Sequence, residues 1–113
     1  MDRKRFEALL DEAMTGLPEW IARKMDNVAV IVEEEPPADD PDLLGIYEGI
    51  PLTERGQDYF GVLPDRIRLF RSSIELEAED EEDVTRVVRE TVIHEVAHFF
   101  GISDDRLHEL DWD

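Results

Sequence analysis

Apolar residues recur at three- and four-residue intervals near the start of the chain. The set is Phe6, Leu9, Leu10, Ala13, Met14 and Leu17. This spacing places them on one face of an amphipathic helix, which Gly16 and Pro18 would end. Because proline is favoured at the first position of a helix, we expect a second short helix from Pro18 to about Lys24.

Three later segments predict strands. Residues 28–32 are all apolar, as expected for a strand that is covered on both faces. Residues 43–52 predict a short strand interrupted by glycines. Residues 66–71 alternate, so that Ile67 and Leu69 face the core while two arginines and a phenylalanine face the other way. Arginine on that outer face favours an edge strand.

Two acidic stretches divide the rest of the chain. Residues 33–42 contain six acids and three prolines, which predicts an exposed loop. Residues 75–83 precede a long helix that we expect from about Glu81 to Phe100. From Val92 onward this helix is apolar except for two histidines and one glutamate, so we expect it to be buried there. Buried ionisable side chains need partners, and a metal ion would compensate them.

The charge of the chain limits the classes of partner that it can bind. The 113 residues suit one ordinary domain, which we expect to span residues 1–113. Thirty acidic residues and 12 basic ones give a formal net charge of −18. Such a surface repels phosphate backbones and anionic lipid, so we expect neither nucleic acid nor a membrane as a partner. Cationic peptides and metal ions would be attracted instead.

The sequence contains no cysteine, which excludes disulfides and thiolate metal sites. Histidine and carboxylate would have to hold any metal. The basic N-terminus is not followed by the long apolar run of a secretory signal or a membrane span. We therefore expect a cytoplasmic protein, and the pattern leaves its oligomeric state open.

A histidine pair with an intervening glutamate is the main candidate for chemistry. His94 and His98 are four residues apart, which puts both imidazoles on one face of the expected helix. Two nitrogens so placed can share one zinc ion. Glu95 is rotated by about 100° from the first histidine, so it can reach a metal-bound water without being a ligand. This is the HExxH arrangement of zinc peptidases.

The residues after the helix supply a candidate third ligand. Gly101 can adopt a positive φ and turn the chain sharply, so that Asp104 folds back toward the metal. His108 and Asp105 are the rival third ligands. The competing role of Asp104 is that of a first-turn acid in a last short helix that Ser103 caps.

The string His94-Glu95-x-x-His98-x-x-Gly101-x-x-Asp104 resembles the extended motif of the metzincin peptidases, in the variant with aspartate as third ligand. The chain from about residue 5 to 110 is similar to a family of minimal zincin-like metallopeptidases. The similarity rests on the first helix with Leu17-Pro18, the strand at 27–32, the Gly45-Ile-Tyr-Glu-Gly49 segment, residues 66–71 and the run 91–110.

This resemblance implies an α+β fold, in which a small mixed sheet packs against two main helices and the zinc motif lies on the second. The chain departs from typical metzincins in one respect. Their methionine-containing turn lies downstream of the third ligand, whereas Met1, Met14 and Met25 all lie upstream of Asp104.

The residues and the resemblance together favour a zinc-dependent peptidase that acts on a peptide or protein substrate, with Glu95 as general base. The alternative is a non-catalytic zinc domain that recruits a partner protein. A metal-dependent nuclease is disfavoured by the charge. Tyr47 or Tyr59 could stabilise an oxyanion, and residues 66–71 could form an edge that pairs with an extended substrate.

Overall fold

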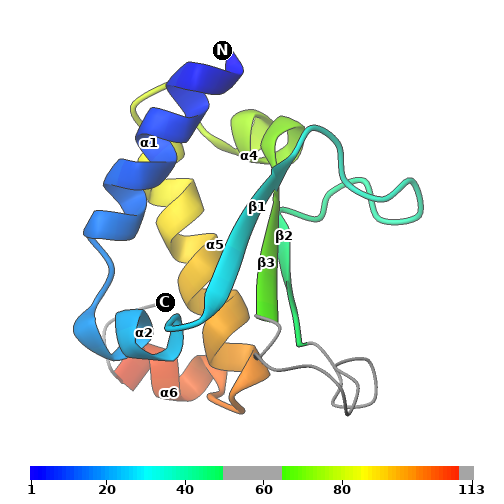
Figure 1. Cartoon of the computed structure of the whole chain (residues 1–113). Coiled ribbons are helices and arrows are strands. Elements are labelled where there is room, and N and C mark those ends of the chain that lie inside the picture. Colours follow the sequence, from blue (N-terminus) through cyan, green and yellow to red (C-terminus); the bar gives the residue numbers. More distant parts are fainter. Residues whose placement is uncertain (50–64, 110–113) are drawn as a thin grey trace, which may run out of the picture.

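The computed structural model describes residues 1–49 and 65–109, apart from the side chains of Asp104, Leu107 and His108. The elements follow one another along the chain as shown in Figure 1. They are α1 (Arg3–Thr15), α2 (Glu19–Lys24), β1 (Val28–Glu33), β2 (Gly45–Glu48), β3 (Asp65–Phe70), α4 (Arg71–Glu77), α5 (Val84–Phe99) and α6 (Asp104–Glu109).

The strands form a small mixed sheet. Among the described residues its order is β1-β3-β2, with β1 parallel and β2 antiparallel to β3. Helix α5 runs between α1 and the sheet, as Figure 1 shows, and it contacts α1, β2 and β3. This arrangement confirms the expected α+β class, with the histidine pair on the second of the two long helices. No helix within the described ranges is long and apolar enough to cross a bilayer.

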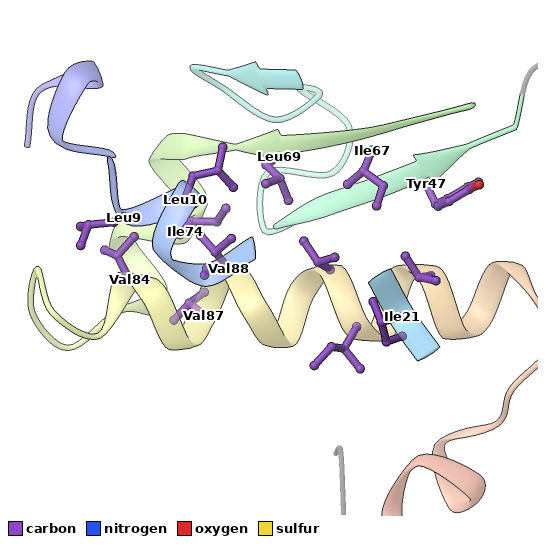
Figure 2. Packing of buried hydrophobic residues seen from close by; sticks show 14 of the residues in the cluster. Leu9, Leu10, Ile21, Tyr47, Ile67, Leu69, Ile74, Val84, Val87 and Val88 are labelled. Carbon is purple, nitrogen blue, oxygen red and sulfur yellow. The ribbon is translucent and has the colours of Figure 1, made fainter. Parts of the chain in front are cut away.

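The core lies on the face of the sheet that α5 covers. Figure 2 shows the buried side chains of α5 pointing toward β2, β3 and the other helices. On α5 the buried residues are Val84, Val87, Val88, Thr91, Val92, Ile93, Val96 and Ala97. Helix α1 adds Phe6, Leu9, Leu10 and Ala13, as its apolar spacing predicts. Burial of these side chains at about 1.5–3 kcal/mol each holds the helix with the histidines against the sheet.

The expectation that residues 66–71 form an edge strand is wrong, because β3 is the central strand. Its arginines are balanced by acids from both neighbours. Arg68 donates to both carboxylate oxygens of Glu33 on β1, at 2.8 and 2.9 Å, and Arg66 donates to Glu48 on β2 at 2.9 Å. The hydrogen bonds from Arg68 also lower the pKa of Glu33. Cross-strand ion pairs thus let arginine occupy the outer face of a central strand.

Strand β1 does not match the expected two-sided cover. It lies at the edge of the described sheet, and Ile31 on its open face is 37% exposed. Val28, Val30 and Val32 pack against the core from the other face. The run of apolar residues therefore includes Ala29 and Ile31 on the second face, since the described helices cover only one side of the strand.

Residues 71–83 differ from the expected acidic lead into a helix. They form the short helix α4 and an acidic turn, and α5 begins at Val84, three residues later than expected. In that turn Asp83 accepts the N–H of Glu79 at 2.9 Å and two hydrogen bonds from Arg86. The first acidic stretch is largely exposed, as expected, at Asp39–Asp42.

Candidate functional site

The C-terminal half of α5 carries His94, Glu95 and His98 on one side and buried residues on the other. Thr91, one turn before Glu95, is buried, and its hydroxyl donates to the carbonyl oxygen of Val87 at 2.7 Å. The apolar face thus fixes the rotation of the helix and turns the three polar side chains outward.

This half of α5 is not buried all round, contrary to expectation. His94 and Glu95 are half-buried, and His98 is exposed. Phe99 and Phe100 are 47% and 43% exposed. The uniform apolar composition of the run includes aromatic residues at the surface, so burial by itself does not require a metal at the histidines.

The separation of the histidines fits a shared metal ion. The ring centres of His94 and His98 are 6.0 Å apart, and the ring planes differ by 12°. With metal–nitrogen bonds of about 2.1 Å and a tetrahedral angle at the metal, two imidazoles on one zinc ion have ring centres about 5.2 Å apart. The observed spacing is within about 1 Å of this value, a difference that small side-chain rotations close, and imidazole nitrogen is a preferred zinc ligand.

The chain after α5 turns as the sequence predicts. Gly101 has a φ of +79°, and its N–H donates to the carbonyl oxygen of His98 at 3.1 Å. The N–H of Ile102 donates to the carbonyl oxygen of Ala97 at 2.8 Å. Helix α6 then begins, and Ser103 caps it by accepting the N–H of Arg106 at 3.1 Å. The tight turn therefore follows within a few residues of His98.

The third ligand stays a prediction. Asp104 is the first residue of α6, but its side chain and that of His108 lie outside the described part of the chain. Asp105 is exposed. Among the side chains that are described, no three metal-ligating groups come together.

Glu95 has a distinctive environment. Partial burial raises the pKa of its carboxyl group. Three features oppose that rise by favouring the charged form: a hydrogen bond from the main-chain N–H of Tyr47, and the proximity of His98 and His94. A carboxylate with a raised pKa beside two imidazoles has the chemistry of a general base.

Tyr47 has the surroundings of a core tyrosine. Its hydroxyl donates to Asp65 Oδ2 at 2.8 Å, and its ring stacks on Phe99 with ring centres 4.0 Å apart. The residue is only 7% exposed. Its hydroxyl is thus hydrogen-bonded to Asp65 instead of serving as an oxyanion donor. The other candidate, Tyr59, lies outside the described residues.

A cleft of about 340 Å³ opens beside Glu95 and His94. From there it extends past Glu90 to Asp40, Asp42 and Glu77. The other lining residues are Leu43, Leu44, Gly45, Val87 and Thr91, so the described lining contains neither lysine nor arginine. Of the ion pairs formed within the described ranges, one engages Glu90, through Arg86, and none engages Asp40, Asp42 or Glu77.

Sequence patterns did not reveal the cleft or the bond from Tyr47 to Glu95. The acidic loop at 33–42 indicated a concentration of negative charge. The sequence did not indicate that Asp40 and Asp42 of this loop would line a cleft beside α5. The Tyr47 donor is a main-chain group, which every residue except proline carries, so the sequence holds no sign of it.

Comparison with known proteins was consistent with these features. The family model described as zincin-like metallopeptidase matches residues 25–113, which include β1, β2, β3 and all of α5. No curated protein sequence matches the chain.

Proposed function

The chain belongs to the zincin-like metallopeptidase family, and from this membership we propose that it hydrolyses peptide bonds with one zinc ion held by His94, His98 and Asp104. The observation that carries the proposal is the placement of Glu95. It is half-buried on the same helix as two histidines within reach of one metal, and it lies at the end of a cleft.

Each residue has a defined part in the proposed reaction. When bound, zinc would supply Lewis-acid chemistry at this end of α5. Glu95 would take the proton of the attacking water at its carboxylate and later pass it to the leaving amine. Burial supports this part, because a raised pKa brings the carboxyl group closer to the pH at which a base works well.

The charge of the cleft supports cationic peptides as substrates. Asp40, Asp42 and Glu77 line it without an ion pair to any described residue. A basic side chain next to the scissile bond would meet these carboxylates and would be favoured over an acidic one. Peptides that carry lysine or arginine are therefore the proposed substrate class.

The alternative is a zinc domain that recruits a partner protein without catalysis. The exposed aromatic side chains of Phe99 and Phe100 at the end of α5 favour it, since exposed aromatics are common at protein interfaces. In this case zinc would stabilise the fold, and no peptide would be cleaved.

Cleavage of a mixed peptide library separates the two. The library is incubated with protein that is loaded with zinc, stripped by chelator, and reloaded. A peptidase gives products that disappear with the metal and return on reloading. A recruiting domain gives none, although zinc still raises its melting temperature.

A further inference from the structure

Strand β2 presents the main-chain groups of two residues away from its neighbour β3. The N–H of Phe70 donates to the carbonyl oxygen of Leu44 at 2.9 Å, so this pair is hydrogen-bonded. Hydrogen-bonded pairs alternate along an antiparallel ladder, and the register pairs Ile46 with Arg68. The main-chain groups of Gly45 and Tyr47 therefore point away from β3, at the edge of the sheet that the described residues form.

The N–H of Tyr47 is used at that edge. It donates to the Glu95 carboxylate, which thereby gains a donor from a strand and not from its own helix. A half-buried carboxylate without such a donor could rotate about its side-chain bonds.

Two glycines, one on each side of the hydrogen bond from Tyr47 to Glu95, set the distance between β2 and α5. A Cβ on Gly45 would lie 2.9 Å from Thr91 Cγ2, and one on Gly49 would lie 2.8 Å from Phe99 Cζ. Between these two glycines the ring of Tyr47 stacks on Phe99. Glycine therefore permits a close approach one turn before and one turn after Glu95.

The repeat distances of the strand and of the helix are similar, which explains how three successive residues of β2 can each lie opposite a residue of α5. Alternate residues of a strand are separated by about 6.8 Å. Residues four apart on a helix are separated by about 6.0 Å along its axis. Gly45, Tyr47 and Gly49 thus lie opposite Thr91, Glu95 and Phe99 in the same order.

We propose that the Gly45-Ile-Tyr-Glu-Gly49 segment is a positioning device for Glu95, in which the Tyr47 N–H orients the carboxylate and the two glycines set the spacing. Its catalytic consequence rests on the proposed peptidase function, whereas its structural part does not. Tyr47 acts through Glu95 and has no contact of its own with the substrate in this proposal.

Two substitutions at the same position isolate the N–H. Tyr47→Pro removes the ring and the donor, and Tyr47→Ala removes the ring alone. Because the N–H points away from β3, proline breaks no bond of the ladder between β2 and β3. We expect kcat to be about 10- to 100-fold lower in Tyr47→Pro than in Tyr47→Ala, with KM unchanged, since a misplaced catalytic group costs this much. Equal kcat values in the two variants would overturn the proposal.

An NMR measurement on the metal-free protein tests the bond without catalysis. We expect Glu95→Ala to shift the Tyr47 amide proton upfield and to speed its exchange with deuterium. Glu82→Ala, which alters an exposed acid at residue 82 before α5, is the matched control and should change neither.

If the Tyr47 amide does not respond to Glu95→Ala, the proposal is overturned. This result can be obtained even if Tyr47→Pro fails to fold. A responsive amide without cleavage of any peptide would keep the positioning contact and refute the peptidase.

Discussion

Thr91 Cγ2 lies 2.9 Å from the point that a Cβ on Gly45 would occupy, where real Cβ contacts are essentially never found. Arg68 O and Leu69 Cδ2, each 3.0 Å from that point, close two further directions. The strand and the helix that carries Glu95 therefore approach as closely as the absence of a side chain allows.

Gly45→Ala should separate β2 from α5. Crowding of this kind costs about 1–3 kcal/mol, and the shift would also lengthen the bond from Tyr47 to Glu95. We expect a lower melting temperature by circular dichroism together with a reduced kcat. Gly16→Ala is the control, because its Cβ would meet only Arg89 and a carbonyl at 3.5 Å or more. Equal melting temperatures for the two variants would show that the contact is not tight.

Removal of cleft charge should weaken the preference for basic peptides. Glu77→Gln and Asp42→Asn each delete a carboxylate from the lining. We expect kcat/KM to fall several-fold for a lysine-containing peptide and to stay constant for its norleucine analogue. Added salt should lower the native value in the same selective way. Glu82→Gln is the control for charge outside the cleft, and a matching loss in that variant would assign the effect to net charge alone.

The acidic turn before α5 should make stability depend on pH. Hydrogen bonds from Arg86 and from the N–H of Glu79 lower the pKa of Asp83 from 3.8 to about 2. A depressed folded-state pKa stabilises the protein above the unfolded value, and this contribution is lost as pH falls from about 4 toward 2.

Asp83→Asn tests this contribution by urea unfolding at several pH values. We expect the difference in unfolding free energy between native protein and variant to be largest above pH 4 and to shrink toward pH 2. A difference that does not change with pH would mean that the bonds of Asp83 stabilise through geometry and not through its charge.

The turn after His98 should depend on the backbone of Gly101. Its φ of +79° is strained for other residues, and no atom of the described part of the chain lies within 4 Å of a Cβ built there. Gly101→Ala should therefore cost about 1 kcal/mol through the backbone alone. Gly101→Asn should cost less, because asparagine tolerates this conformation better. Similar melting temperatures for Gly101→Ala and the native protein would contradict the expectation that a Cβ at residue 101 strains the backbone.

The helices at the two ends of the core were predictable because their apolar residues follow the helical period. Phe6, Leu9 and Ala13 in α1 and Val84, Val88 and Val92 in α5 are all buried. Helix α4 was not predicted because only Ser73 and Ile74 of its seven residues are buried. Two adjacent buried residues do not produce the apolar periodicity by which a helix is recognised in a sequence.

The position of β3 in the sheet could not be predicted from its own residues. Arginine on a strand suggests an edge until its acidic partners are known. Here those partners are Glu33 and Glu48, 35 and 18 residues away in the sequence from Arg68 and Arg66. Such long-range pairs are set by the fold, so a local pattern does not contain them.

The candidate site was predictable as far as residue identity and spacing define it. His94, Glu95 and His98 share a helix, and this follows from their numbering. The donor from Tyr47 and the route of the cleft depend on how β2 and the acidic loop pack beside α5, and neither is a property of the motif.

Glu95→Gln separates proton transfer by Glu95 from metal binding by the histidines. The variant keeps the shape of the side chain and removes its ability to take a proton. We expect about one zinc ion per chain, as in the native protein, and cleavage slowed by about 100-fold or more. The matched substitution Glu82→Gln should leave both quantities unchanged. Cleavage by Glu95→Gln at the native rate, with zinc bound, would contradict the assignment of Glu95 as the base.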